Sequence, residues 1–453
     1  MTTRPESITP EQESVLGSVP EEWEVVQLEG LGHWGGGKTP RKSTQEYWNG
    51  ETLWVSPKDM DGSVVQRTED HVTQVAISEK NLTVYDPGSV MVVFRSGVLR
   101  HTFPVATCNR PFAVNQDMKV LTPGRRVNNE FAFHLIDHLG PVVLQKATKV
   151  GTTVESVDTD SFMSLSVGLP PLPEQRRIAD VLDTVDAAIQ ETDSVIEKQE
   201  QVKTGLLQDL LTRGLDADGR LRDPEREPEV FWETELGITP KAWEVKQVGE
   251  LAAHVSSGST PKGGKKVYQQ EGIPFIRSQN VWSDGLDLND VALIPREIHE
   301  DMTRTQLQAH DVLLNITGAS IGRCCVVPPW LGEANVNQHV CIVRLPQADS
   351  RDSHFLSRIL ACHIGQQQIK RLQAGGSREG LNYSQLKSFV VPWPSEKERR
   401  MIVKRVETAR GKQDEEKAYR GKLQHLKTGL MQDLLTGRVR VPEAEACVDE
   451  VVV

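Results

Sequence analysis

The segment from Gly32 to Thr39 fits the pattern GxxxxGK[ST], in which backbone amides and a lysine bind nucleotide phosphates. Such a loop needs a preceding strand and a helix that begins at its Lys-Thr pair. Here Pro40 follows Thr39, and the residues beyond it lack a helical apolar period. The twin stretch 257–261 keeps Thr-Pro but lacks the Lys and the Gly before it. The sequence therefore favours a repeated turn, with a nucleotide site as the alternative.

Basic, hydroxyl and amide side chains gather around these turns, and they suit nucleic acid. Lysine and threonine suit phosphate contacts, while arginine, glutamine and asparagine can read base edges. The alternatives are solvated basic loops and, for the Asn-Gln pairs, ordinary turn caps or amides that face adenine. The candidate DNA-binding residues are Lys38, Thr39, Arg41, Lys42, Lys58, Asn115, Gln116 and Thr153 in the first half, and Lys262, Lys265, Lys266, Arg277, Asn280, Asn337, Gln338, Ser377 and Arg378 in the second.

Signatures of common catalytic sites are missing from the sequence. It has no HExxH or GxSxG, and Val327–Trp330 has the wrong first residue for the [DNS]PP[YFW] of amino-methyltransferases. The six cysteines form no CxxC pair and have no histidine at ligand spacing, which favours reduced thiols over disulfides or zinc. We therefore expect no catalytic residue, metal or cofactor in this chain.

The chain repeats itself at about half its length. Lys203–Thr212 returns 224 positions later as Lys427–Thr436 with nine of ten residues identical. Shorter phrases also recur, among them Trp23-Glu24-Val25 as Trp243-Glu244-Val245. A repeat of this kind indicates a tandem duplication that presents two similar surfaces. Within each half, short apolar runs such as Val90–Phe94 and Asp311–Ile316 predict buried strands.

A long helix is predicted to close each half, from about 174 to 212 and from about 396 to 436. A Pro lies at each start and none follows inside either stretch. Apolar stripes recur at spacings of three and four, and the second stripe includes Leu423, Leu426 and Leu430. Residues 171–213 carry a net charge of −4 and residues 394–440 carry +6, which favours pairing of the two helices. The alternative is that each helix packs only on its own domain.

Length and charge set further limits. The 453 residues suit two to four domains, and no apolar run approaches the roughly 20 residues that span a bilayer. The N-terminus has no signal-peptide core, so a cytoplasmic location is expected. The net charge of −11 argues against DNA, but residues 171–237 alone carry −9, and the two large repeated blocks carry −4 and +2.

Together these features resemble the specificity (S) subunit of type I restriction–modification systems. The phrases that carry the resemblance are Pro170–Ile178, the repeated Thr-Gly-Leu-Leu/Met-Gln-Asp-Leu-Leu-Thr, Gly37–Pro40, Trp54–Met60, Gly272–Arg277 and Gly376–Tyr383. One departure is the start of the second helix, Glu396–Met401, where the family usually has Glu-Gln. This departure affects the partner contacts of that helix.

The resemblance implies an α+β fold in which two similar globular α/β target-recognition domains are separated by a pair of long antiparallel helices (a coiled coil) in a pseudo-two-fold repeat. The expected segments are an N-terminal tail (1–16), a first recognition domain (17–170), a central helix (171–213), a linker (214–237), a second recognition domain (238–393), a C-terminal helix (394–438) and a C-terminal tail (439–453).

The same resemblance implies a function without catalysis in this chain. Each domain would read one half of an asymmetric two-part site on double-stranded DNA, and the helices would set the spacer. The helices would also dock two methyltransferase subunits, and a restriction–translocase subunit would join them. S-adenosylmethionine, ATP and magnesium would belong to those partners. The candidate docking residues are Gln175, Ile178, Leu206, Leu210, Arg399, Leu430 and Leu434.

Two other classes of protein stay open at this point. One is a nucleotide-hydrolysing enzyme built on Gly32–Thr39, and nucleotide binding that Lys38→Ala abolishes would identify it. The other is a purely structural coiled-coil adaptor, which would show no DNA affinity even with its partners.

Overall fold

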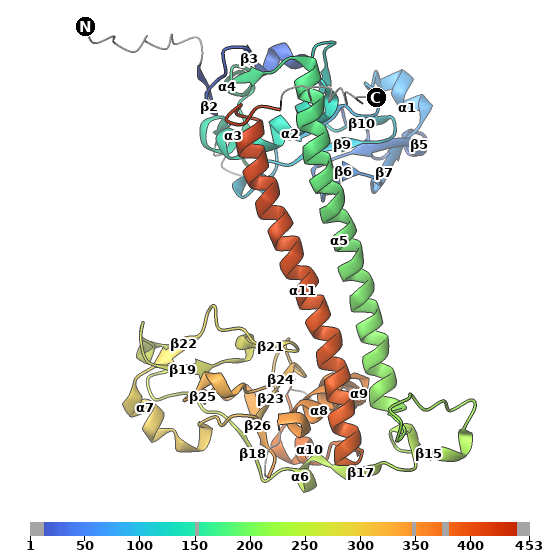
Figure 1. Ribbon diagram of the computed structural model, residues 1–453, viewed down its shortest axis with the longest axis vertical. Coiled ribbons are helices and arrows are strands. Elements are labelled where there is room, and N and C mark those ends of the chain that lie inside the picture. Colours follow the sequence, from blue (N-terminus) through green and yellow to red (C-terminus); the bar gives the residue numbers. More distant parts are fainter. Residues whose placement is uncertain (1–12, 150–153, 347–349, 374–379, 442–453) are drawn as a thin grey trace, which may run out of the picture. The chain divides into compact units, whose positions relative to one another are not determined.

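The computed structural model describes residues 13–149, 154–346, 350–373 and 380–441. They form two compact units: unit 1 holds the described residues up to Ser194 and from Lys417 onward, and unit 2 is Val195–Glu416. Each unit combines a mixed helix and strand domain with stretches of two long helices, α5 (Leu172–Thr212) and α11 (Glu396–Leu434). Figure 1 shows both helices as uninterrupted. The α+β prediction and both long helices are confirmed.

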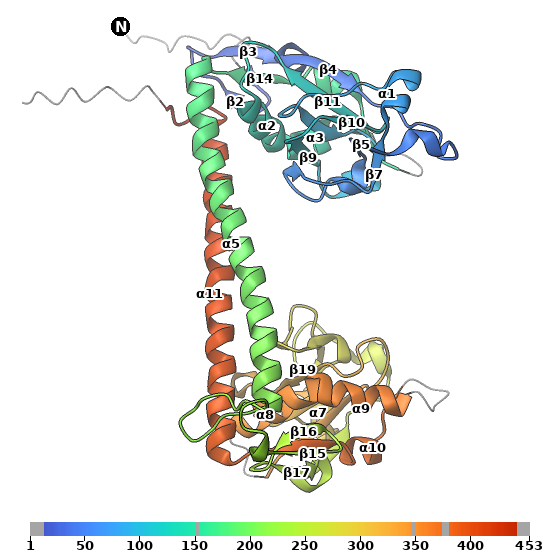
Figure 2. The ribbon, with the colours of Figure 1, turned by 90° about the vertical axis from the view of Figure 1, so that its right-hand side faces the viewer.

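The mixed domain of unit 1 contains two principal sheets. The first has the order β4-β11-β8-β9-β6 and the second the order β10-β5-β7. A further pair, β3 with β14, runs side by side in Figure 2. The strands are β1 (Glu13–Ser14), β2 (Gly17–Ser18), β3 (Glu24–Gln27), β4 (Gly32–Gly36), β5 (Trp48–Val55), β6 (Val64–Val65), β7 (Asp70–Val72), β8 (Val90–Val93), β9 (Val105–Cys108), β10 (Phe112–Val114), β11 (Met118–Pro123), β12 (Thr148–Lys149), β13 (Ser156–Val157) and β14 (Ser166–Leu169).

The mixed domain of unit 2 repeats this plan in a reduced form. Its sheets have the orders β18-β26-β23-β24 and β22-β19-β25, and β17 pairs with β27 as β3 pairs with β14. The strands are β15 (Phe231–Thr234), β16 (Gly237–Pro240), β17 (Glu244–Gln247), β18 (His254–Ser257), β19 (Ile273–Ile276), β20 (Val281–Trp282), β21 (Gly285–Leu286), β22 (Ala292–Ile294), β23 (Val312–Asn315), β24 (Cys324–Val326), β25 (Asn335–Val336), β26 (Val340–Arg344) and β27 (Val390–Trp393).

Short helices cover these sheets. Unit 1 has α1 (Gln74–Lys80), α2 (Asn129–His138), α3 (Gly140–Lys146) and α4 (Thr159–Met163), and unit 2 has α6 (Val248–Leu251), α7 (Arg296–Asp301), α8 (Ser350–Ala361), α9 (His363–Gln373) and α10 (Tyr383–Lys387). In α2, the Asn128 side chain accepts a hydrogen bond from the Phe131 amide and so caps the first turn. The predicted buried strands are confirmed, because all four residues of β8 and all four of β23 are buried.

The core of each unit includes both long helices. In unit 1, Phe131 of α2 belongs to one apolar cluster with Ile178 of α5 and Leu434 of α11. In unit 2, Phe355 of α8 shares a cluster with Leu210 of α5 and Ile402 of α11. Each long helix therefore packs on a mixed domain and also lies beside the other helix.

The predicted pairing of the helices rests on opposite charges. In unit 1, Asp186 of α5 binds Lys427 of α11 at 2.8 Å, and Asp193 forms an ion pair with Arg420. In unit 2, Lys203 donates to the buried Gln413 at 3.0 Å. Later residues on α5 meet earlier residues on α11, so the two helices run antiparallel within each unit. The polar middle of the second helix thus pairs through polar contacts. Leu426, which the stripe placed on the buried face, is instead 51% exposed.

A buried glutamate holds each unit together where a long helix begins. In unit 1, Trp23 Nε1 donates to Glu174 at 3.2 Å, and Arg440 donates to both of its carboxylate oxygens at 2.8 Å. We call this arrangement the Trp-Glu-Arg clasp.

The clasp has a counterpart in unit 2. There Trp243 Nε1 donates to Glu398 at 2.9 Å, and Arg222 binds the two carboxylate oxygens at 2.6 and 3.1 Å. Glu398 lies 224 positions after Glu174, so the departure seen at Glu396–Met401 leaves this glutamate in place.

We predict that Glu398→Ala destabilises unit 2 by about 3 kcal/mol, because it leaves the Arg222 guanidinium buried without its carboxylate. The Arg222 side chain is only 12% exposed. Urea unfolding would measure the loss. Glu396→Ala in the same turn is the control, because Glu396 is exposed and its ion pair within the described residues is a surface i,i+4 pair with Arg400. Equal stability of the two variants would contradict the clasp.

The clasp of unit 1 also predicts a pH dependence. Burial by itself would raise the pKa of Glu174, but hydrogen bonds from Arg440 and Trp23 outweigh burial and lower it. A lowered pKa stabilises the fold above the ordinary glutamate pKa of about 4.3, and this stability is lost as the pH falls through the lowered value. The difference in unfolding free energy between wild type and Glu174→Gln should therefore be largest near pH 7 and shrink below pH ~4. A difference that grows on acidification would contradict this assignment.

Candidate nucleic-acid interface

Both mixed domains contain the same glycine turn, directly after β4 in unit 1 and directly after β18 in unit 2. Residues 37–40 follow β4 and residues 258–261 follow β18. A Cβ on Gly37 would lie 1.7 Å from the Val114 carbonyl oxygen, and one on Gly258 would lie 1.9 Å from that of Val336. Only glycine fits so close to a neighbouring backbone. The sequence comparison treated the glycine before Lys38 as lost in the second half, and this was wrong, because Gly258 occupies the same place.

The nucleotide-binding alternative is contradicted by the structure. Gly32–Gly36 forms β4, which pairs with β11 from Gly32 opposite Pro123 to Gly36 opposite Lys119. After Pro40 the next helical element is a single 3-10 turn at Gln45–Tyr47, so no helix begins at Lys38-Thr39. Without that helix, amide groups do not converge on a phosphate.

In each domain an Asn-Gln pair lies beside the glycine turn and forms a second turn. The Asn115 amide donates to the Val55 carbonyl at 2.9 Å, and the Asn337 amide donates to that of Ile276 at the same distance. Both asparagines are buried, and their side-chain oxygens accept hydrogen bonds from the amides two residues on, Asp117 and His339. The asparagines are therefore turn caps, as one of the alternatives proposed.

The glutamines have a different environment. Gln116 and Gln338 are exposed. Gln116 accepts a hydrogen bond from the Thr39 hydroxyl, and Gln338 accepts one from the Thr260 hydroxyl at 2.6 Å. Each threonine thus joins the glycine turn to the Asn-Gln turn. We call this shared assembly the Thr-Gln frame. It presents a carboxamide to solvent in both domains.

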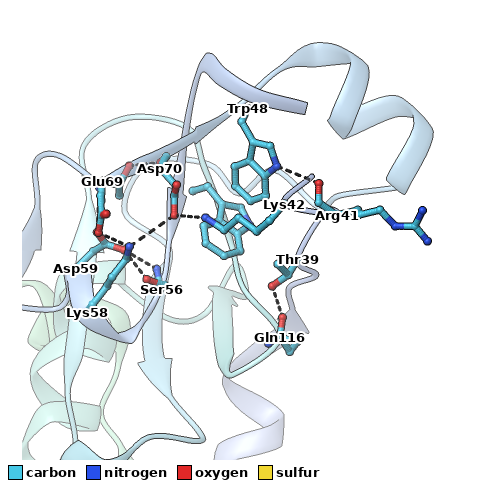
Figure 3. A network of polar contacts seen from close by, with 12 residues as sticks. Thr39, Arg41, Lys42, Trp48, Ser56, Lys58, Asp59, Glu69, Asp70 and Gln116 are labelled. Atoms are coloured by element: carbon cyan, nitrogen blue, oxygen red, sulfur yellow. Dashed lines mark hydrogen bonds and ion pairs between the residues drawn. The ribbon is translucent and has the colours of Figure 1, made fainter. Parts of the chain in front are cut away.

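Two tryptophans of β5 hold the first frame in place, and Figure 3 labels one of them, Trp48. Trp54 Nε1 donates to the Lys38 carbonyl at 3.1 Å, and Trp48 Nε1 donates to that of Arg41 at 3.2 Å. The rings meet edge to face at 5.2 Å. The pairing of β5 with β7 shifts register between Trp48 and Thr52, so simple alternation along the strand does not by itself place the two tryptophans on one face. The sequence carries no simple spacing signal for this contact, because the irregularity depends on how β5 pairs with β7.

The basic side chains around the first frame differ in availability (Figure 3). Lys42 lies 4.2 Å from the centre of the Trp48 ring and 2.6 Å from Asp70. Lys58 binds Glu69 and lies 3.6 Å from Asp70. Lys38 and Arg41 are exposed, and no ion pair involves either of them within the described ranges.

The ion pairs among Lys42, Lys58, Glu69 and Asp70 shift the pKa values of Asp70 and Lys58. Burial alone would raise the pKa of Asp70, but Lys42 and Lys58 outweigh burial and lower it. The hydrogen bond to Glu69 raises the pKa of Lys58. Lys42 and Lys58 are therefore already paired with carboxylates, so Lys38 and Arg41 are better placed to meet phosphate.

In unit 2 the predicted residues also divide into exposed and structural groups. Lys262, Lys265 and Lys266 are exposed, and in the described part of the chain none of them forms an ion pair. Arg277 donates to the Asp290 carbonyl at 2.6 Å, while the buried Asn280 donates to the carbonyls of Asp287 and Asp290. Asn280 therefore shapes the loop after β19.

Three predicted residues, Thr153, Ser377 and Arg378, lie outside the described residues. The sequence also missed two aromatic groups in unit 2. The Tyr383 hydroxyl hydrogen-bonds Ser257 beside the second frame, and the Arg323 guanidinium stacks 3.8 Å from the centre of the exposed Trp282 ring. Stacked arginine and exposed aromatic rings suit nucleic acid as well as protein.

Most of the predicted docking residues on the long helices are occupied by the chain's own fold. Gln175, Ile178, Leu210, Arg399 and Leu434 are buried. Gln175 donates to the carbonyls of Pro170 and Arg126, and Arg399 binds Asp352 at 2.8 and 2.9 Å. These five side chains cannot touch a partner without opening the fold, which corrects their assignment.

Leu206 and Leu430 differ from those five residues because they are only half-buried and keep an accessible side. A contact of these two leucines with a partner stays a prediction.

Over the described residues, no cluster of His, Cys, Asp or Glu could hold a metal ion. Within the same ranges, no helix is both long and apolar enough to cross a membrane.

Two segments of the chain, residues 20–199 and 240–418, match the family described as type I restriction modification DNA specificity domain. The MjaVIII specificity subunit of Methanocaldococcus jannaschii is 22% identical over 93% of this chain and 94% of that subunit. The EcoR124I/EcoR124II specificity subunit of Escherichia coli is 34% identical, but this match covers 39% of the chain and 43% of that subunit's length.

Solved structures share the fold. An S subunit of a type I restriction-modification system from M. genitalium aligns over 94% of this chain and 99% of its own, with a TM-score of 0.54 and 14% identity. A chain from a structure of a type I R-M system aligns over 93% of this chain and all of its own, with the same TM-score and 16% identity.

We predict that Gly37→Ala and Gly258→Ala each destabilise their unit by about 1–3 kcal/mol, because the added methyl group collides with backbone that cannot move independently. Gly62→Ala is the control, since a Cβ there meets nothing within 4 Å. Urea unfolding of the three variants would measure the difference. If Gly37→Ala proved as stable as Gly62→Ala, the close packing of the frame would be refuted.

Proposed function

This chain belongs to the type I restriction modification DNA specificity family and carries two of its domains, and from that premise we propose how it reads DNA. Each mixed domain reads one half of an asymmetric, two-part site on double-stranded DNA, and the Thr-Gln frame lies at the reading surface. The chain itself performs no catalysis.

The duplicated frame is the observation that carries this proposal. Gln116 and Gln338 are exposed at equivalent places, and a glutamine side chain can form two hydrogen bonds with an adenine edge. Arg41 in the first frame and Lys262 in the second follow the same Thr-Pro step and are available to phosphate or to guanine.

The neighbours of the frame differ between the two domains. Lys38 corresponds to Ser259, and Lys58 corresponds to Gln279 at the same place after the paired strands β5 and β19. A shared frame with different neighbours fits two readers of related design and unlike target sequences.

We further propose that the paired helices fix the spacing between the half-sites. Both helices contribute to both units, and a helix of 41 residues is about 60 Å long. Two readers that face the same side of a duplex need targets centred about 34–36 Å apart. A pair of uninterrupted helices is stiff enough to keep such a distance constant.

The helices also offer equivalent apolar positions for partners. Val195 and Val202 of α5 are 37% and 62% exposed, and the residues 224 positions later, Tyr419 and Leu426 of α11, are 51% exposed each. Large apolar side chains at matching exposed positions suit two copies of one partner. We propose that these copies are methyltransferase subunits that use S-adenosylmethionine. A restriction–translocase subunit would then add cleavage with ATP and magnesium.

A pair of matched double variants tests the reading of half-sites. Gln116→Ala with Arg41→Ala should relax one half of the recognised sequence, and Gln338→Ala with Lys262→Ala should relax the other half. Each lost base contact is worth about 1–3 kcal/mol of discrimination. Sequencing of methylated bases in cells that express each variant with its partner subunits would show the change. A variant pair that relaxes both halves equally, or neither half, would contradict the proposal.

A further inference from the structure

In unit 2 the two long helices leave an open groove of about 710 Å³. Apolar side chains line it from both helices and from the chain that follows α5: Val202, Leu206, Leu215, Met401 and Ala409. Its charged lining residues are all basic: Lys203, Lys404, Arg405 and Lys412. We call this surface the unit 2 groove.

The basic residues of the groove are mostly available. Lys404 and Lys412 are exposed, and within the described residues neither forms an ion pair. Lys203 is neutralised by Glu200 at 2.8 Å, and Arg405 donates to the Gly219 carbonyl, which does not cancel its charge. Between these groups Val202 is 62% exposed, so apolar surface and uncompensated positive charge lie together.

The duplication supplies an internal comparison for this surface. In unit 1 the positions equivalent to Lys404, Arg405 and Lys412 are Asp180, Val181 and Ala188. The equivalent of Lys203 is Lys427, which Asp186 neutralises at 2.8 Å.

Four of the five apolar members of the surface have apolar equivalents in unit 1, and Arg177 is the equivalent of Met401. Leu426 is the equivalent of Val202 and is 51% exposed, and Leu430 is the equivalent of Leu206. The repeat therefore keeps most of the apolar contact positions. It replaces the basic residues Lys404, Arg405 and Lys412 by one acidic and two apolar residues, and Arg177 is the one basic residue that it adds.

We propose that the two partner-docking faces are unequal, and that the unit 2 groove binds an amphipathic helix of the methyltransferase subunit whose apolar stripe is flanked by acidic residues. This inference rests on the docking proposed above. Two copies of one partner present the same helix, so only the copy on unit 2 gains attraction between its acidic flanks and the groove. That copy binds first and more tightly at low salt. The copy on unit 1 binds through apolar contact, which salt screens little.

Matched variants of the whole chain test this inference with the cognate methyltransferase subunit. Val202→Asp blocks unit 2 and Leu426→Asp blocks unit 1, and both residues are exposed enough to be replaced without loss of folding. Each variant should bind one copy of the methyltransferase. Between about 50 and 300 mM salt, the Kd of the copy that remains on Leu426→Asp should rise about tenfold, while the Kd on Val202→Asp should change less than about twofold.

A charge-only variant separates electrostatics from shape. Lys404→Ala with Lys412→Ala, introduced into Leu426→Asp, should weaken binding at low salt and remove most of its salt dependence. Asp180→Ala in Val202→Asp is the matched control: it removes a charge from the unit 1 face without adding an attraction, so the Kd should still rise less than about twofold with salt. Native mass spectrometry would count the bound copies, and sedimentation would give the Kd values.

Equal salt dependence of Leu426→Asp and Val202→Asp would overturn the inequality of the two faces and leave the docking itself standing. If the wild-type chain bound no methyltransferase at any salt concentration, the docking proposed above would fail, which is a different result.

Discussion

The buried carboxylate at the start of each long helix is the interaction on which the rest of the structure depends. Burying the carboxylates of Glu174 and Glu398 without partners would be costly. Each accepts a hydrogen bond from an indole N–H and hydrogen bonds from two nitrogens of one arginine. The three partners come from distant parts of the sequence: the start of a mixed domain, the first turn of the helix that follows it, and the chain beyond the other helix. One clasp therefore fixes both helices and the domain in each unit.

The Thr-Gln frame lets two diverged domains keep the same local backbone geometry. The Thr-Gln frame needs its glycine against the strand that carries the Asn-Gln turn, and this constraint is met in both units. The side chains of Lys38, Arg41 and Lys262 beside the frame are exposed, so this packing constraint does not fix which residues occupy these positions. A rigid backbone with replaceable neighbours allows specificity to change without change in the fold.

The paired helices combine two requirements that usually conflict. They must be held to each other, which the ion pairs of Asp186 and Asp193 and the buried Gln413 accomplish. The proposed docking also requires accessible apolar surface, and residues such as Val202 and Leu426 are exposed. Because polar contacts secure the middle of the pair, fewer apolar residues are needed there, and some can face outward.

The sequence by itself determined the duplication, the two long helices, the buried strands and the complementary charge of the helices, because these follow from local spacing and composition. Only the tertiary structure decided which side chains were available. Gln175 reads as a surface residue of an amphipathic helix, yet the backbone carbonyls of Pro170 and Arg126 enclose it. The second arginine of the clasp, Arg222, has no counterpart at the 224-residue spacing from Arg440, since position 216 is an aspartate. Burial and long-range hydrogen bonds depend on which distant segments pack together. The periodicity of one helix does not indicate which segments these are.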